Sequence, residues 1–230
     1  ELRQTLGMLT QRGAKVVAME VSSHALVLDR VYGLDFDVAV FTNLTPDHLD
    51  FHGNIDSYFD AKVRLFLDLS DDAFAVINID DEHGRKLSTM SRGQVVTYGW
   101  DDDADIRPID ITTIPSISGR VATPVGEIAL DMPLVGRFNV ENSMAAIGAA
   151  IGLGLSTEQI ENGLSAARAL PGRFEPIVAG QDFAVIVDYA HTPDALENVL
   201  TEARHLASGK VICVVGCGGD RDRAKRPVMG

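Results

Sequence analysis

The sequence predicts an α/β fold in which a parallel sheet is followed by a small antiparallel meander and then by the start of a second unit. Short apolar runs rich in valine and isoleucine alternate with helical patterns between residues 15 and 98, which is typical of parallel βαβ units. Between residues 106 and 130, threonine, serine, glycine and proline interleave with isoleucine and valine, which favours antiparallel hairpins.

The elements of the first unit follow in order along the chain. Strands of the parallel sheet are predicted at residues 15–21, 37–42, 73–79 and 94–98. The intervening helices are predicted at residues 54–69 and 80–91. After the meander, two more helices are expected at residues 139–152 and 157–168. The first of these is rich in alanine and should pack closely, and the second has Ser156 in place to cap it.

Turn residues near position 170 indicate a domain boundary, with residues 1–170 in one domain and residues 171–230 in the next. The second unit should contain strands at residues 175–179, 183–188 and 210–216 and a helix at residues 195–207. About 60 residues are too few for a complete doubly wound domain, so we expect this unit to be truncated and the chain to be an internal part of a longer protein.

Composition excludes several classes of function. The 33 acidic and 20 basic residues give a formal charge of -13, which argues against a nucleic-acid partner. No apolar run approaches the roughly 18 residues needed to span a membrane, and no signal peptide is present, so a cytoplasmic location is expected. Cys213 and Cys217 have no second pair, and we expect small buried thiols rather than a zinc site or a disulfide.

Two candidate ligands follow the first two predicted strands. Glu20 comes directly after an apolar run, and ligands of open α/β sheets bind at the carboxyl ends of strands. Its carboxylate could hold magnesium in a nucleotide-hydrolysing fold, or it could cap the next helix. His48 follows the second strand, so both side chains should lie at the same edge of the sheet. The neighbouring Asp47, Asp50 and His52 could be turn and cap residues.

Lys62 interrupts an apolar stripe of the predicted helix at residues 54–69. The stripe consists of Ile55, Tyr58, Phe59, Lys62, Leu65, Phe66 and Leu69. A charge on a core-facing stripe needs a partner or a function. A neutral lysine amine can take up carbon dioxide to become a carbamate, an anionic oxygen ligand of the kind magnesium prefers. Alternatively, the side chain extends past Asp60 to solvent or pairs with a loop aspartate.

Seven motifs lie in order over about 200 of the 230 residues. The motifs are MEVSSH (19–24), FTNLTPDHLDFHG (41–53), YFDAK (58–62), GRFNVEN (136–142), LPGRFE (170–175), VDYAHTPD (187–194) and GCGGDRD (216–222). Together they resemble the Mur ligases. Within the family, the match is best to the members that add the third residue of the peptidoglycan stem peptide. The resemblance implies an ATP-binding central domain with a meander, followed by a Rossmann-like C-terminal domain.

The resemblance also implies roles for individual residues. Glu20, His48 and a carbamylated Lys62 match ligands of two magnesium ions, and Lys62, His48 and Arg173 would be the catalytic residues. The residues that match the ATP site are Asn142, Arg173, Asp188 and His191. The positions that match binding of the UDP-muramoyl peptide or the amino acid are Ser22, Arg30, Asp220 and Arg221.

The reaction implied by the resemblance is an ATP-dependent amide ligation. The D-glutamate carboxylate of UDP-MurNAc-L-Ala-D-Glu would be phosphorylated, and the amine of meso-diaminopimelate or L-lysine would then attack the acyl phosphate. The family's phosphate loop, GxxxxGK[ST], does not occur in these residues, so the chain by itself is expected to be inactive. A monomer is expected. A catalytically silent homologue that binds nucleotide or UDP-sugar, and a ligase similar to folylpolyglutamate synthetase, are the alternatives.

Overall fold

The computed structural model describes residues 2–217 and 225–230, and its first sheet is parallel with the strand order β1-β2-β3. The strands are β1 (Val38–Phe41), β2 (Phe74–Asn78) and β3 (Gln94–Tyr98). All three were predicted, and their register places Val38 beside Phe74 and Phe74 beside Gln94. The central strand β2 is almost completely buried, which explains its continuous apolar sequence.

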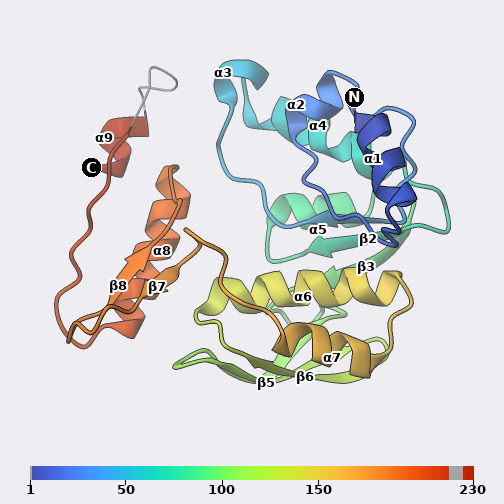
Figure 1. Ribbon diagram of the computed structural model, residues 1–230. Helices are drawn as coiled ribbons and strands as arrows, with labels where there is room; N and C mark the ends of the chain where they lie inside the picture. Colours follow the sequence, from blue (N-terminus) through green and yellow to red (C-terminus); the bar gives the residue numbers. More distant parts are fainter. Residues whose placement is uncertain (1, 218–224) are drawn as a thin grey trace.

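Helices cover both faces of this sheet (Figure 1). On one face lie α4 (Ile55–Leu67) and α5 (Glu82–Ser88), and on the other lies α6 (Arg137–Gly152). The Asn54 side chain caps α4 by accepting a hydrogen bond from the Ser57 amide at 2.8 Å. The buried residues of α4 are Tyr58, Phe59, Ala61, Val63 and Phe66. Most of them belong to one apolar cluster with Ala39, Phe41, Ala75 and Ile77 of the sheet.

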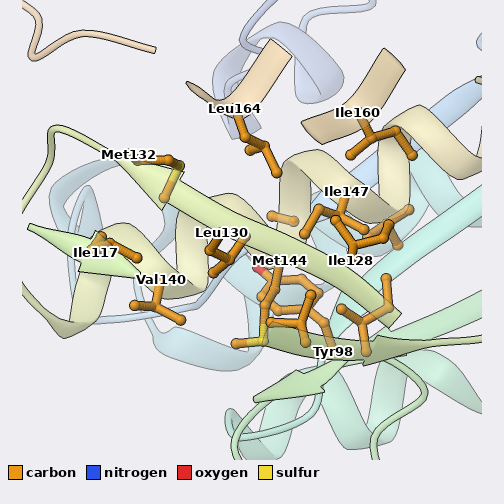
Figure 2. Packing of buried hydrophobic residues seen from close by; sticks show 14 of the residues in the cluster. Tyr98, Ile117, Ile128, Leu130, Met132, Val140, Met144, Ile147, Ile160 and Leu164 are labelled. Carbon is orange, nitrogen blue, oxygen red and sulfur yellow. The ribbon is translucent and has the colours of Figure 1, made fainter. Parts of the chain in front are cut away.

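The expected meander is present as β4 (Arg107–Thr112), β5 (Ile117–Thr123) and β6 (Gly126–Met132), paired antiparallel in that order. A single parallel bridge between Tyr98 and Ile106 joins it to β3. The helix α7 (Thr157–Ser165) begins with a capping box between Ser156 and Gln159. Figure 2 shows apolar side chains of α6, α7 and the meander packed together in one core.

The strand predicted at residues 15–21 is wrong. The helix α1 (Leu2–Gln11) precedes this segment and the short helix α2 (Ser23–Val27) follows it, but the segment itself pairs with no strand and most of its side chains are exposed. A cavity of about 430 Å³ lies between the segment and β1. An apolar run becomes a strand only where neighbouring backbone satisfies its amides and carbonyls, and no strand in the described residues pairs with this run.

The second unit contains β7 (Glu175–Ile177) and β8 (Val185–Val187), paired antiparallel, followed by α8 (Pro193–Leu206) and α9 (Lys225–Met229). The strand predicted at residues 210–216 is absent. Ile212 and Val214 are 84% and 96% exposed, because no neighbouring strand pairs with this apolar run. Cys213 is exposed and Cys217 is partly exposed, so the expectation of buried thiols is also wrong.

The two units contact each other at the N-terminus of α6. No side chain of its own segment caps this helix at Gly136, whereas Glu202 of α8 accepts a hydrogen bond from the Arg137 amide at 3.1 Å. The rings of Phe138 and Phe174 pack edge to face with centroids 5.4 Å apart. A carboxylate at a helix N-terminus is favourable, because the first amides of the helix have no partner within it.

Among the described residues, no helix has the length and apolar character needed to cross a membrane.

Candidate functional site

Lys62 lies half-buried on α4, between the buried residues Ala61 and Val63. Its Nζ atom is 5.1 Å from the centroid of the Tyr58 ring, one helical turn earlier. Within the part of the chain that the structure describes, the amine forms no ion pair or hydrogen bond, so the expected alternative of an aspartate partner is not observed. Burial lowers the pKa of Lys62, and the smaller effect of the negative charge of Glu20 raises it.

His48 precedes the short helix α3 (Leu49–His52) in a left-handed backbone conformation with φ of 55°. This conformation is uncommon for a residue other than glycine, and it often occurs at functional sites. The His48 Nε2 atom lies 3.6 Å from Asp47 Oδ2. Its ring is 4.9 Å from that of His24 and 6.3 Å from that of Tyr58, edge to face in both pairs. His48 and Lys62 therefore lie near the same tyrosine.

Glu20 is exposed at the end of the unpaired segment, two residues before the N-cap of α2. Burial is the main cause of the raised pKa of Tyr58, and the negative charges of Asp47 and Glu20 raise it further. The structure thus brings His48 and Lys62 to the same tyrosine, whereas Glu20 lies at the exposed end of a segment that was expected to be a strand.

The donor set at this location fits magnesium only if Lys62 supplies an oxygen. Among the described residues, no three histidine, cysteine, aspartate or glutamate side chains are arranged to hold a metal. A neutral lysine is the form that reacts with carbon dioxide, and burial favours that form. A carbamate on Lys62 would add an anionic oxygen to the carboxylate of Glu20, and oxygen ligands are those that magnesium prefers.

Two further histidines belong to this group, and sequence reasoning gave them no role in chemistry. His24 packs on Phe51 with ring centroids 4.1 Å apart, and His52 packs on Tyr58 at 5.0 Å with an angle of 28° between the rings. Burial, followed by the nearby His24, His48 and Lys62, lowers the pKa of His52. A sequence signal was available, because each histidine follows a candidate ligand by four residues: His24 follows Glu20, and His52 follows His48.

The two candidate substrate residues in the first unit lie at either end of one short segment. Ser22 is the N-cap of α2, and its hydroxyl accepts a hydrogen bond from the Ala25 amide at 3.2 Å. Arg30 is exposed just beyond that helix. Ser22 thus has a structural task, which leaves its hydroxyl hydrogen free to be donated to a ligand.

The candidate nucleotide residues form a separate group in the second unit, apart from Asn142, which is exposed on α6. The carboxylate of Asp188 accepts hydrogen bonds from the amides of Phe174 and Ala190, both at 2.7 Å. The guanidinium of Arg173 lies 5.1 Å from the Tyr189 ring centroid, instead of pairing with the nearby Glu175.

Between β8 and α8, the rings of His191 and Tyr189 pack with their centroids 5.0 Å apart. Asp220 and Arg221 lie outside the described residues.

Comparison with known proteins identifies the family. Residues 1–150 match the model of the Mur ligase middle domain, and residues 172–230 match that of the Mur ligase glutamate ligase domain. The chain belongs to the Mur ligase family. The resemblance recognised in its seven motifs is therefore confirmed.

Curated relatives extend this match over the whole chain. A UDP-N-acetylmuramoyl-L-alanyl-D-glutamate--2,6-diaminopimelate ligase of Geobacter metallireducens is 48% identical over 237 residues, covering 100% of this chain and 46% of the relative. The enzyme of the same name from Gloeobacter violaceus is 49% identical over 232 residues, covering 100% of this chain and 47% of the relative. The chain spans about half the length of the curated relatives it matches.

Solved structures agree with the fold. A structure of a UDP-N-acetylmuramoyl-L-alanyl-D-glutamate--2,6-diaminopimelate ligase superposes with a TM-score of 0.77 at 36% identity, covering 99% of this chain and 48% of that one. A folylpolyglutamate synthetase complex with AMPPCP and folate superposes with a TM-score of 0.69 at 22% identity, covering 84% of this chain and 48% of that one. The second likeness concerns the fold alone. The α/β fold class predicted from the sequence is confirmed.

Proposed function

We propose that this chain is part of an ATP-dependent ligase that adds the third amino acid to UDP-MurNAc-L-Ala-D-Glu in peptidoglycan synthesis. The added residue would be a diamino acid, meso-diaminopimelate or L-lysine, and the names of the relatives favour diaminopimelate. The protein would act as a cytoplasmic monomer without a nucleic-acid or membrane partner. Its domains would be those proposed from the sequence, with a boundary near residue 170.

The observation that carries this proposal is the environment of Lys62. Its amine is half-buried, has no ionic partner among the described residues, and lies 5.1 Å from the centroid of the Tyr58 ring. A lysine held in this way is suited to become a carbamate: the neutral amine bonds to the carbon of CO2 and releases a proton. A catalytically silent homologue would have no need for this arrangement.

Glu20, His48 and the carbamylated Lys62 would hold two magnesium ions near the reacting phosphate. When bound, the ions neutralise the charge that spreads over a phosphoryl group during transfer. The fold of this chain holds two of these ligands: α4 carries Lys62, and His48 precedes α3 with its ring edge to face with Tyr58 at 6.3 Å. Ser22 and Arg30 are assigned to binding of the UDP-linked peptide.

The turn between the two units supports a role in nucleotide binding. Asp188 fixes the backbone of this turn through the Phe174 amide, and Arg173 projects beside Tyr189. We assign Arg173 to the phosphates of ATP, Asn142 to the adenine side, Asp188 to the ribose and His191 to the same nucleotide. Asp220 and Arg221 are assigned to the incoming amino acid.

The proposal is tested by assaying a full-length protein that contains this sequence with ATP, Mg2+, UDP-MurNAc-L-Ala-D-Glu and either meso-diaminopimelate or L-lysine. We expect ADP, phosphate and a UDP-linked tripeptide with meso-diaminopimelate. Ligation of glutamate to a folate would instead support the folylpolyglutamate synthetase alternative. Binding of ATP or UDP-peptide without turnover would support the silent homologue.

A further inference from the structure

We propose that His52 is a positioning residue that fixes the positions of the three candidate metal ligands, Glu20, His48 and Lys62, relative to one another. This inference rests on the proposed function. His52 ends α3, the helix that His48 precedes, and its ring contacts two other elements: α2, which begins three residues after Glu20, and α4, which carries Lys62. It is not itself among the assigned ligands.

The first contact reaches the Glu20 segment. The His52 Nε2 atom and the Ser23 hydroxyl are 2.9 Å apart. Ser23 begins α2, three residues after Glu20, and it is only 2% exposed. A buried hydroxyl without a partner would be costly, so this hydrogen bond fixes the position of α2 relative to α3.

The second and third contacts reach His48 and the helix of Lys62. The His52 amide donates a hydrogen bond to the His48 carbonyl at 3.0 Å, which closes the single turn of α3. The His52 ring stacks on the buried Tyr58 ring, which in turn lies against Lys62. One side chain and its amide therefore connect the three parts of the chain that the proposed metal site requires.

This connection has a functional consequence because the segment that leads to Glu20 is not held in place by strand pairing in the described structure. Residues 15–21 pair with no strand, so α2 depends on side-chain contacts for its position. The partners of metal ligands typically affect metal affinity or activity by about 10–100-fold when they are removed. Loss of the His52–Ser23 bond should therefore displace Glu20 relative to Lys62 while leaving the core of α4 intact.

Three variants of a full-length protein containing this sequence separate the contacts. His52→Phe keeps a ring against Tyr58 but removes the hydrogen bond to Ser23. Ser23→Ala removes the same bond from the other side. His52→Gln retains a group able to bond with Ser23 and removes the aromatic stack. The matched control is His83→Phe, since the ring of His83 also packs on an aromatic residue of α4, at 5.1 Å from Phe59, but His83 belongs to α5, which carries no candidate ligand.

We expect His52→Phe and Ser23→Ala each to lower kcat by about 10–100-fold and to raise the Mg2+ concentration for half-maximal activity. The double variant should be no worse than either single one, because both remove one interaction. His52→Gln should recover most of the activity. Additive losses, no recovery in His52→Gln, or equal losses in His83→Phe would overturn the proposal.

Amide hydrogen exchange provides a readout that does not depend on ligase activity. Peptides covering residues 20–30 should exchange faster in His52→Phe and Ser23→Ala, by about tenfold or more, and at the wild-type rate in His83→Phe. Unchanged exchange in the first two variants would refute the positioning role. If the wild-type protein has no ligase activity with any substrate, the proposed function fails, whereas the exchange result still decides whether His52 holds this segment.

Discussion

The Nζ atom of Lys62 lies 5.1 Å from the centroid of the Tyr58 ring, one turn earlier on the same helix. The tyrosine is buried, so its ring shields one side of the amine from water. The same ring contacts His52 on the neighbouring loop. Tyr58 therefore contacts both Lys62 and His52 at the proposed metal site, although it is not assigned as a metal ligand.

We predict that Lys62→Ala in a full-length protein lowers ligase activity by on the order of 10²-fold or more, because metal-based stabilisation of the transition state is worth several kcal/mol. Adding short carboxylic acids should restore part of the activity by placing an oxygen ligand in the vacated position. The matched control is Lys86→Ala, since the Lys86 amine lies 5.0 Å from the Phe59 ring in an equivalent contact outside the site. Undiminished activity in Lys62→Ala would show that this lysine is structural.

Arg173→Ala should lower the rate of phosphoryl transfer by on the order of 10²-fold, while binding of UDP-MurNAc-L-Ala-D-Glu changes little. The reason is that Arg173 lies in the turn between the units and would approach ATP when they close together. Rapid-quench measurement of phosphoryl transfer and equilibrium binding of the UDP-dipeptide separate the two effects. Arg168→Ala is the control, because Arg168 lies just before the turn and its guanidinium donates hydrogen bonds to the backbone carbonyls of Ser165 and Ala167. Equal losses of transfer and binding would contradict the assignment of Arg173 to ATP.

Gly148 allows α6 to approach the sheet closely. A Cβ atom at this position would lie 2.5 Å from Val76 Cγ1 and 3.3 Å from Ile106 Cδ1. We expect Gly148→Ala to lower the free energy of unfolding by about 1–3 kcal/mol, because the core must shift to accept the methyl group. Urea denaturation followed by circular dichroism measures this change.

The control is the helical residue Gly163, where a Cβ atom would meet nothing within 4 Å. Gly163→Ala should raise the free energy of unfolding by about 0.5–1 kcal/mol through helix propensity. If both substitutions stabilise the protein, the close packing of α6 on β2 is incorrect.

Tyr98 should make stability depend on pH in the alkaline range. Burial raises its pKa above the usual value, and the negative charges of Glu141, Asp80 and Asp81 add to the effect. Because the unfolded chain loses this proton near pH ~10 and the folded chain does not, the contribution of Tyr98 to stability is complete below that pH and falls as pH rises.

Tyr98→Phe should remove this part of the pH dependence. At neutral pH it should cost about 0.5–1.5 kcal/mol, since the hydroxyl donates a hydrogen bond to the Phe41 carbonyl at 3.3 Å. Urea denaturation of both proteins from pH 7 to 11 gives the comparison, and the exposed Tyr32→Phe should behave as the wild type. An unchanged alkaline slope in Tyr98→Phe would refute the role of the buried hydroxyl.

The sequence by itself determined the elements whose stabilisation is local or follows from a simple pattern. The strands β1 to β3, the meander and the helices α4, α6, α7 and α8 all lie where periodicity, turn residues and caps place them. Ser156 and Gln159 close the capping box of α7 within four residues, so no distant contact is needed to start that helix. The family, too, was recognisable from the motifs alone.

Only the tertiary structure decided which apolar runs became strands and which polar side chains met. Residues 15–21 and 210–216 have strand-like sequences, but a strand needs backbone partners that a local pattern cannot supply. His24 and His52 are 28 positions apart and come together, at 5.6 Å between ring centroids, only because α2 packs beside α3 and α4. The half-burial of Lys62 likewise depends on these packed neighbours, because the water an amine loses is set by everything around it rather than by its own helix.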